Sequence, residues 1–227
     1  MALIQGAAAI AEQELLNLNP ELINPFMHII QFYSHSPESL PKKRGKQPTG
    51  GVEHIKSLVQ SYHKARQRKR PGEPQTVPDP LVSFILQHWY NVLEQNLEDA
   101  RKEHQLAMAA ENLVGELLER YLAQILEPTG WIWCAGSIVK SIDFIKPPLP
   151  DADIWTMLQI KNRDNSENSS SGAIRNGTPI QKWHRTNSKT GNTNWQKFPD
   201  EQIRANLSEE GFQAFVRNHI EELKAEQ

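Results

Sequence analysis

Three polar residues stand out in an otherwise apolar part of the sequence. Asp143 lies in the segment SIDFI, and Gln159 and Lys161 lie in the segment WTMLQIK. Side chains alternate between the two faces of a strand, so Gln159 and Lys161 are expected to share one face. If Asp143 belongs to the neighbouring strand, a carboxylate, an amide oxygen and an ammonium group converge. Such oxygens suit Mg²⁺, and the ammonium group can orient an attacking water, so the pattern favours phosphodiester hydrolysis.

The acidic member of this group has competing candidates. Asp143 lies inside an apolar strand pattern, where a carboxylate without a partner is energetically costly. Asp151 and Asp153 lie in the proline-rich turn KPPLPDAD, which favours aspartate for conformational reasons alone. We therefore prefer Asp143 to Asp153, and we expect Asp143 and Gln159 to be the metal ligands.

The elements that carry these residues follow a change in hydrophobic period. The pattern is helical up to the stop signal Pro128-Thr129-Gly130 and then changes to a period of about two. WIWCAGSIVKSIDFIK and DIWTMLQIK are therefore predicted to form two or three strands of a small sheet. The predicted helices span residues 7–18, 20–33, 52–70 and 80–96, a long stretch ending near 125, and a closing stretch from 200 or 208 to 225. This order indicates an α/β fold, with a helical N-terminal portion over residues 1–100 and a core over residues 101–227.

The net charge of −2 conceals a strongly basic segment. Residues 42–70 contain ten lysines and arginines against the single acid Glu53. A local basic face attracts phosphate whatever the overall charge is. We expect nearly all of this segment to contact the DNA backbone, and the alternative is a solvated helix end, where cations are favoured. The basic residues are Lys42, Lys43, Arg44, Lys46, Lys56, Lys64, Arg66, Arg68, Lys69 and Arg70.

The remaining composition narrows the class of protein. Cys134 is the only cysteine, which excludes an internal disulfide and a zinc ribbon and fits a reducing cytoplasm. No stretch approaches the roughly 20 apolar residues of a membrane span, and the N-terminus lacks the basic head of a signal peptide. We expect an unexported protein that does not interact with membranes.

Residues 162–200 form a polar segment of a different kind. They are rich in Asn, Ser, Thr, Arg and Lys, with Trp183 and Trp195 as isolated apolar anchors. Such a segment either stays mobile or folds around a polar partner. Arginine reads guanine in the major groove and Asn reads base edges, although about half or more of protein–DNA hydrogen bonds go to the backbone. The candidate DNA contacts are Arg163, Asn165, Arg175, Asn176, Lys182 and Arg185.

The arrangement of Asp143 and Gln159-Ile160-Lys161 resembles the PD-(D/E)xK nuclease superfamily. The departure is Gln159, because a neutral amide is a poorer metal ligand than a carboxylate. The resemblance implies a restriction-endonuclease-like core, and a helix before the strands often supplies another Glu. In GELLERYLAQIL, Gly115 stands four residues before Glu119 and matches that element. Glu119 is therefore a catalytic candidate beside Asp143, Gln159 and Lys161, with an ordinary solvated helix residue as the alternative.

A more specific resemblance covers residues 111–195. LQIKNRDNSENSSSGAIRNGTPIQKWHR, together with ENLVGELLERYLA, resembles the SinI and AvaII group of type II restriction endonucleases. This resemblance implies a Mg²⁺-dependent enzyme that cuts double-stranded DNA at GGWCC in a prokaryotic cytoplasm. It also implies a homodimer, because a DNA site with two-fold symmetry is most simply read by a protein with the same symmetry. A methyltransferase that acts on the same site is implied as well.

Two other readings stay open at this point. A DNA-repair or defence nuclease of the same fold would recognise DNA structure or damage rather than one short site. A non-catalytic DNA-binding module would keep the basic face without a working site, and its binding would depend strongly on salt.

Overall fold

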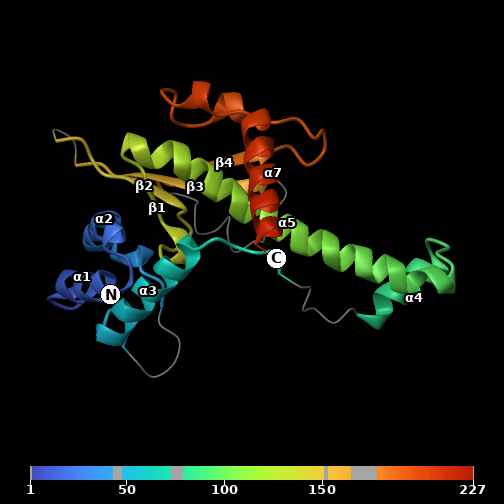
Figure 1. The fold of residues 1–227 in the computed structure, drawn as a ribbon, viewed down its shortest axis with the longest axis horizontal. Coiled ribbons are helices and arrows are strands. Elements are labelled where there is room, and N and C mark those ends of the chain that lie inside the picture. The colour runs from blue at the N-terminus through green and yellow to red at the C-terminus, as the bar shows by residue number, and fades with distance from the viewer. Residues whose placement is uncertain (1, 43–47, 73–78, 151–152, 165–177, 227) are drawn as a thin grey trace.

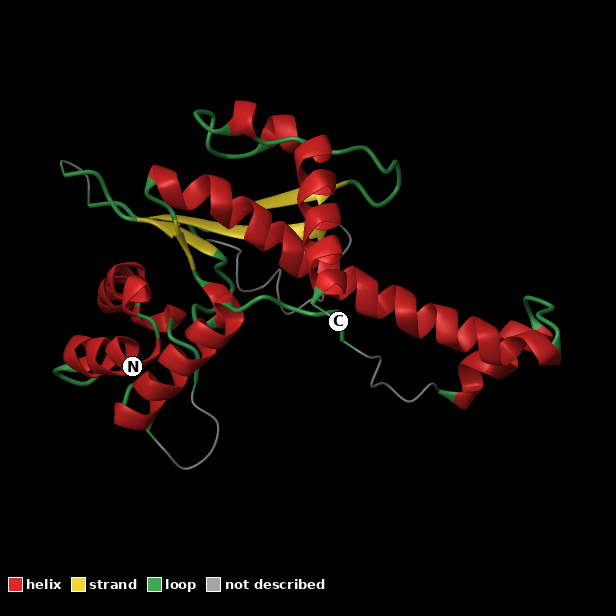
Figure 2. Cartoon of the chain, viewed as in Figure 1, coloured by secondary structure: helices red, strands yellow, loops and turns green. Residues whose placement is uncertain are grey.

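A small sheet and the long helix that crosses it organise the molecule (Figures 1 and 2). The structure, a computed structural model, describes residues 2–42, 48–72, 79–150, 153–164 and 178–226. The helices are α1 (Ala7–Leu18), α2 (Ile23–His35), α3 (Val52–Arg66), α4 (Pro80–His88), α5 (Leu97–Leu126) and α7 (Glu209–Ala225). The strands are β1 (Ile132–Trp133), β2 (Phe144–Lys146), β3 (Thr156–Arg163) and β4 (Gln181–Thr186).

The sheet is mixed and has the order β1-β2-β3-β4. β2 pairs antiparallel with both β1 and β3, whereas β3 and β4 are parallel. Phe144 lies opposite Leu158 and Ile160 lies opposite Trp183, and these four side chains are buried. The expected α/β architecture with a small sheet is therefore present, and its buried strands need cover from the helices.

The helices α1, α2 and α3 are joined to the sheet rather than separate from it. The Tyr33 hydroxyl of α2 donates to the carbonyl of Ile138. The Lys140 amide donates to the carbonyl of Ser39 at 2.8 Å. Buried side chains of these helices and of the strands belong to one hydrophobic cluster. The division of the chain near residue 100 stays a prediction.

Helix α5 connects the body of the molecule to a projection. Its 30 residues span about 45 Å. The C-terminal half buries Leu117, Leu118 and Leu122, whereas the N-terminal half extends away from the body and ends beside α4 (Figure 1). Despite this length α5 is too polar for a bilayer, and within the described residues no helix has the length and apolar character of a membrane span.

Two predicted helices end earlier in the structure than expected. The helix expected over residues 52–70 ends at Arg66, where Arg120 of α5 donates to the last carbonyls, including that of Ala65 at 2.6 Å. The helix expected over residues 80–96 ends at His88. The helix expected over residues 7–18 is confirmed.

Two expectations about the strands also changed. Residues 181–186 in the polar segment form β4, because Trp183 is buried and its ring lies 5.1 Å from that of Trp195. This aromatic contact buries apolar surface and so stabilises a strand within an otherwise polar segment. Asp143 lies directly before β2 rather than inside a strand. Its position is nevertheless fixed by backbone hydrogen bonds to Leu158 on β3 and to Cys134, which directly follows β1.

Candidate active site

Asp143 is held by its backbone and by its side chain. Its amide donates to the carbonyl of Leu158 at 2.9 Å, and its carbonyl accepts from the Cys134 amide at 2.8 Å. Its carboxylate oxygen Oδ2 accepts a hydrogen bond from the Ile160 amide at 2.6 Å. Burial raises the pKa of Asp143 to about 6, although the Ile160 amide and the charge of Lys161 both lower it. The carboxylate is thus fixed in place but costly to ionise without further positive charge.

Glu119 reaches the same site from the buried half of α5. Its Oε2 atom accepts a hydrogen bond from Nε1 of Trp133 at 3.0 Å. Burial, and after it the charge of Asp143, raises the pKa of Glu119 to about 8. The Trp133 hydrogen bond and the charge of Lys161 oppose that rise. The two carboxyl groups therefore lie close enough for the charge of one to disfavour ionisation of the other.

Lys161 and Gln159 both lie on β3 but differ in their surroundings. Lys161 lines the same cleft as Asp143 and Glu119, and its charge lowers the pKa of both carboxyl groups. Gln159 is only 5% exposed and is not among the residues that line this cleft. The structure therefore brings together Asp143, Glu119 and Lys161, whereas metal ligation by Gln159 stays a prediction.

These three residues line a cleft of about 710 Å³, a volume within the range of ligand sites. Helix α3 forms one wall of the cleft, α5 forms another, and the turn at residues 135–137 forms part of the base. Acidic, basic and amide side chains occur together in this cleft. Such a lining suits the binding of a metal ion by the acids and of a substrate phosphate by the bases. The polar lining also includes Ser61, Lys64, Lys69, Glu111, Asn112, Glu116, Ser137 and Asn162.

The donor set of this cleft fits Mg²⁺. Two buried carboxyl groups with raised pKa values repel each other when both are ionised, and a divalent cation between them would remove that cost. Among the residues with a described structure, no group of three His, Cys, Asp or Glu side chains could hold a metal. Mg²⁺ commonly binds through one or two carboxylates and completes its shell with water and substrate phosphate.

Trp133, which donates to Glu119, is itself contacted by two arginines. The guanidinium carbons of Arg66 and Arg120 lie 5.3 Å and 5.4 Å from the centre of its ring. Trp133 is buried, and Arg66 also donates to its carbonyl at 3.3 Å. Sequence analysis missed this role, because no local pattern links Trp133 to Glu119, fourteen residues earlier on another element.

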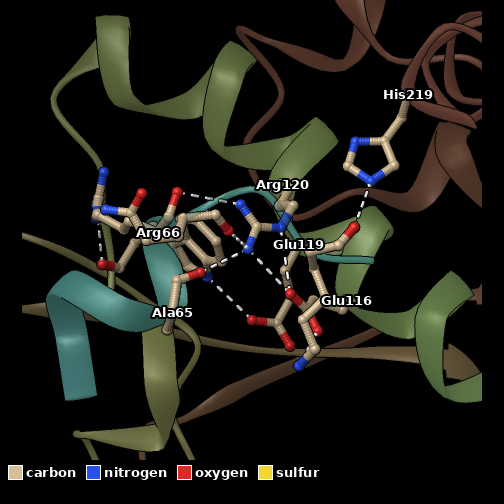
Figure 3. A network of polar contacts seen from close by, with 9 residues as sticks. Ala65, Arg66, Glu116, Glu119, Arg120 and His219 are labelled. Atoms are coloured by element: carbon tan, nitrogen blue, oxygen red, sulfur yellow. Dashed lines mark hydrogen bonds and ion pairs between the residues drawn. The ribbon is translucent and has the colours of Figure 1, made fainter. Parts of the chain in front are cut away.

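The two arginines are fixed by acids on α5 and just beyond it (Figure 3). Arg66 pairs with Glu127, which follows α5. Arg120 pairs with Glu116 at 3.0 Å and also donates to the carbonyl of Ala65 at the end of α3. The position of Glu119 therefore depends on a network that joins α3, β1 and α5.

Part of the basic segment is committed to contacts inside the protein. The side chain of Arg66 is only 15% exposed. Lys69 pairs with Glu116 at 2.7 Å, and Arg68 pairs with Glu222 at 2.8 Å. The expectation that nearly all of the segment contacts phosphate is therefore corrected for Arg66, which has a structural role. The residues of the segment that lie outside the described structure are Lys43, Arg44 and Lys46.

The candidate DNA contacts differ in their accessibility. Arg163 is exposed at the end of β3, and Lys182 is partly buried on β4. Arg185 donates to Oδ1 of Asn162 at 2.9 Å and pairs with Glu209, so its guanidinium is already engaged. A DNA contact by Arg185 stays a prediction. Three further candidates lie outside the described residues: Asn165, Arg175 and Asn176.

The fold and the cleft together define a class of enzyme. A small mixed sheet crossed by a long helix, with two buried carboxyl groups and a lysine in one cleft, is consistent with a restriction-endonuclease-like α/β nuclease. The SinI restriction endonuclease family matches residues 7–222. The chain therefore belongs to the SinI restriction endonuclease family.

Two relatives are similar over nearly their whole length. The chain is 48% identical over 220 residues to the type II restriction enzyme Eco47I of Escherichia coli, and the match covers 96% of this chain and 95% of the relative. It is 46% identical over 224 residues to the type II restriction enzyme SinI of Salmonella infantis, and the match covers 97% of each chain. The chain is thus a type II restriction enzyme, a site-specific deoxyribonuclease.

Proposed function

We propose that this deoxyribonuclease is a Mg²⁺-dependent enzyme of the PD-(D/E)xK type that cuts both strands of double-stranded DNA at GGWCC. The chemistry is carried by one observation: the carboxyl groups of Asp143 and Glu119 interact in one cleft that Lys161 also lines. The PD-(D/E)xK assignment is supported by Asp143 directly before β2, by Lys161 on the neighbouring strand β3, and by Glu119 on the helix that precedes the strands.

Asp143 and Glu119 would hold the magnesium ion, with Gln159 as a further predicted ligand. When bound, Mg²⁺ supplies polarisation of the scissile phosphate and offsets the negative charge that develops in the transition state. The Ile160 amide and the Trp133 indole keep the two carboxylates in fixed orientations. Little reorganisation is therefore needed when the substrate binds.

Lys161 is the proposed positioning group for the attacking water. Its ammonium group donates up to three hydrogen bonds and can hold a water beside the phosphate. Its positive charge also favours ionisation of Asp143 and Glu119, since it lowers the pKa of each. One lysine therefore serves both the nucleophile and the metal ligands.

The sequence site GGWCC is supported by the resemblance of residues 111–195 to the SinI and AvaII group. A site with two-fold symmetry favours a homodimer, which brings one active site to each strand. Arg163 and Lys182 are proposed to contact the DNA, together with Asn165, Arg175 and Asn176. A methyltransferase acting on the same site would protect the host DNA in a prokaryotic cytoplasm.

The test is digestion of a sequenced plasmid by the purified protein with Mg²⁺, beside an EDTA control, followed by sequencing of the fragment ends. Discrete ends at GGWCC are expected with Mg²⁺ and none with EDTA. Ends at a different fixed sequence would refute GGWCC but leave the chemistry intact. Cutting that follows DNA damage or structure would indicate a repair or defence nuclease. Binding without cleavage would indicate a non-catalytic module.

A further inference from the structure

Helix α4 exposes its apolar side chains to solvent and buries a polar one, whereas an amphipathic helix usually does the opposite. Leu81, Phe84 and Ile85 lie on its outer face at helical spacing, and each is more than half exposed. Ser83, which is polar, is the buried residue of the helix. In a helix that covers its own core, the apolar side chains face inward. The apolar face of α4 is therefore available to something outside this chain.

The reversed orientation is built into the local structure. The Asp79 side chain accepts a hydrogen bond from the Leu81 amide at 2.9 Å, and Pro80 occupies the first turn, so α4 begins with a regular cap. On the inner side, Nε of Arg101 on α5 donates to the Ser83 hydroxyl at 2.6 Å. A polar contact thus fixes α4 against α5 while its apolar residues point away.

The apolar surface continues beyond α4. Trp89 is 77% exposed, and Tyr90 and Leu93 are also largely exposed in the loop that leads to α5. With the three side chains of α4 they expose on the order of 800 Å², since a large aromatic side chain alone spans roughly 150–250 Å². A monomer rarely exposes a contiguous apolar patch above about 600 Å². We call residues 80–110 the α4–α5 arm (Figures 1 and 2).

We propose that the α4–α5 arm is the surface through which two copies of this chain associate, each arm packing against the other. The area matches the roughly 800 Å² that each partner contributes to a standard protein interface. Trp, Tyr and Phe are the residue types enriched in such interfaces. Two helical hairpins related by a two-fold axis would bury both apolar faces in a four-helix arrangement.

The charge of the arm argues against other occupants. It contains Glu94, Glu98, Asp99 and Glu103 against Arg101 and Lys102, a net charge of −2. A net acidic surface repels the phosphates of DNA and of an anionic bilayer. A second copy of the arm carries far less negative charge than DNA or an anionic bilayer, so the repulsion between two arms is smaller.

The position of the arm gives the association a consequence for cleavage. Helix α5 carries the arm at its N-terminal end and Glu119 near its C-terminal end. Because this helix is continuous, packing two arms together fixes the relative placement of two active sites. The inference rests on the proposed function only here, in that an enzyme cutting both strands needs two such sites.

The first test is the mass of the full chain in solution, measured by analytical ultracentrifugation at micromolar concentration. The wild-type protein is expected to have a measured mass of twice the 25.9 kDa of one chain. Ile85→Glu is expected to weaken self-association about 100-fold or more, as loss of a central interface residue does. Leu16→Glu on α1 is the matched control, because Leu16 is 51% exposed and Ile85 is 52% exposed. A monomeric wild-type chain, or an Ile85→Glu chain that dimerises normally, overturns the proposal.

The second test works even if a charged variant misfolds. Cys134 is buried, so a cysteine introduced at Phe84 would be the accessible thiol of the chain. Phe84→Cys treated with a short bis-maleimide is expected to give a covalent dimer, whereas Leu16→Cys stays monomeric. Equal cross-linking of the two variants, or none in either, overturns the proposal.

The outcome is separable from that of the proposed function. If the wild-type chain cuts plasmid DNA but Ile85→Glu remains dimeric, the arm is not the interface and the function stands. If the arm variants change the mass as expected but no cleavage occurs, the interface stands and the function fails.

Discussion

Asp143 and Glu119 are each oriented by one hydrogen bond from a group in a fixed position. The donor to Asp143 is a strand amide, and the donor to Glu119 is an indole that two guanidinium groups contact. Both carboxyl groups are buried, and their pKa values are raised in consequence. At the scale of single residues, the structure therefore fixes two buried carboxyl groups, which under the proposed function would be the ligands of Mg²⁺.

The role proposed for Lys161 gives a direct prediction. Lys161→Ala is expected to lower the single-turnover cleavage rate by about 10²–10⁴-fold, because the positioned water and the nearby positive charge are both lost. DNA binding, measured by fluorescence anisotropy in EDTA, is expected to change little. Lys140→Ala is the control, since Lys140 is exposed. Normal cleavage by Lys161→Ala would show that the active site lies elsewhere.

The hydrogen bond from Trp133 gives a prediction about pH. It lowers the pKa of Glu119, so Trp133→Phe is expected to raise that pKa further and to move the acidic limb of the cleavage profile to higher pH. Raising the pH should restore much of the rate. Trp131→Phe is the control, because the Trp131 indole donates to Asp200 instead. A loss of rate that is equal at every pH would assign Trp133 a packing role only.

At the scale of elements, the cleft depends on a close approach between α3 and the turn at residues 135–137. Gly136 has φ 82°, and a Cβ atom at this position would lie 2.7 Å from the carbonyl oxygen of Ser61 on α3. Both Gly136 and Ser61 line the cleft. The approach of these two elements therefore sets the distance between the α3 wall and the base of the site.

This contact is measurable by a pair of glycine substitutions. Gly136→Ala is expected to lower the free energy of unfolding by roughly 2–4 kcal/mol, through left-handed strain and the clash with Ser61. Gly130→Ala should cost only about 1–2 kcal/mol, because Gly130 has φ 88° but open space around its Cβ position. The measurement is urea unfolding of both variants. Equal losses would mean that α3 yields easily and that the contact does not fix the cleft.

At the scale of the whole molecule, the buried carboxyl groups link folding to pH. A carboxyl whose pKa is raised on folding stabilises the protein when it is protonated, and this stability is lost as the pH rises through the folded pKa. The folded values here are about 6 for Asp143 and about 8 for Glu119. The loss should therefore begin near the ordinary carboxyl pKa of about 4 and be complete by about pH 8.

The corresponding measurement is thermal unfolding of metal-free protein across that range. Glu119→Gln is expected to remove most of the pH dependence, on the order of 2–4 kcal/mol, whereas Glu111→Gln, exposed on the same helix, should not. Mg²⁺ should raise the melting temperature most at high pH, where both carboxyl groups are ionised. The assignment of these groups as metal ligands would fail if Mg²⁺ stabilised Glu119→Gln as strongly as the wild type.

Local rules were enough to predict much of this protein. The change of period after Pro128-Thr129-Gly130 separated the helices from the strands, because helical and strand spacing are properties of neighbouring residues. The same alternation singled out Asp143 and Lys161 as polar residues in an apolar context. The motif residues and the segments between residues 111 and 195 carried the resemblance to restriction endonucleases, which the family match confirmed.

Contacts between residues far apart in the sequence determined the features that local rules did not predict. Strand β4 depends on the packing of Trp183 against Trp195, and α3 ends where Arg120 of α5 reaches its carbonyls. The orientation of Glu119 likewise depends on Trp133, which lies on another element. Local sequence preferences register only a few neighbouring positions, whereas burial, and with it the raised pKa values of the two carboxyl groups, exists only once α3, α5 and the sheet have packed together.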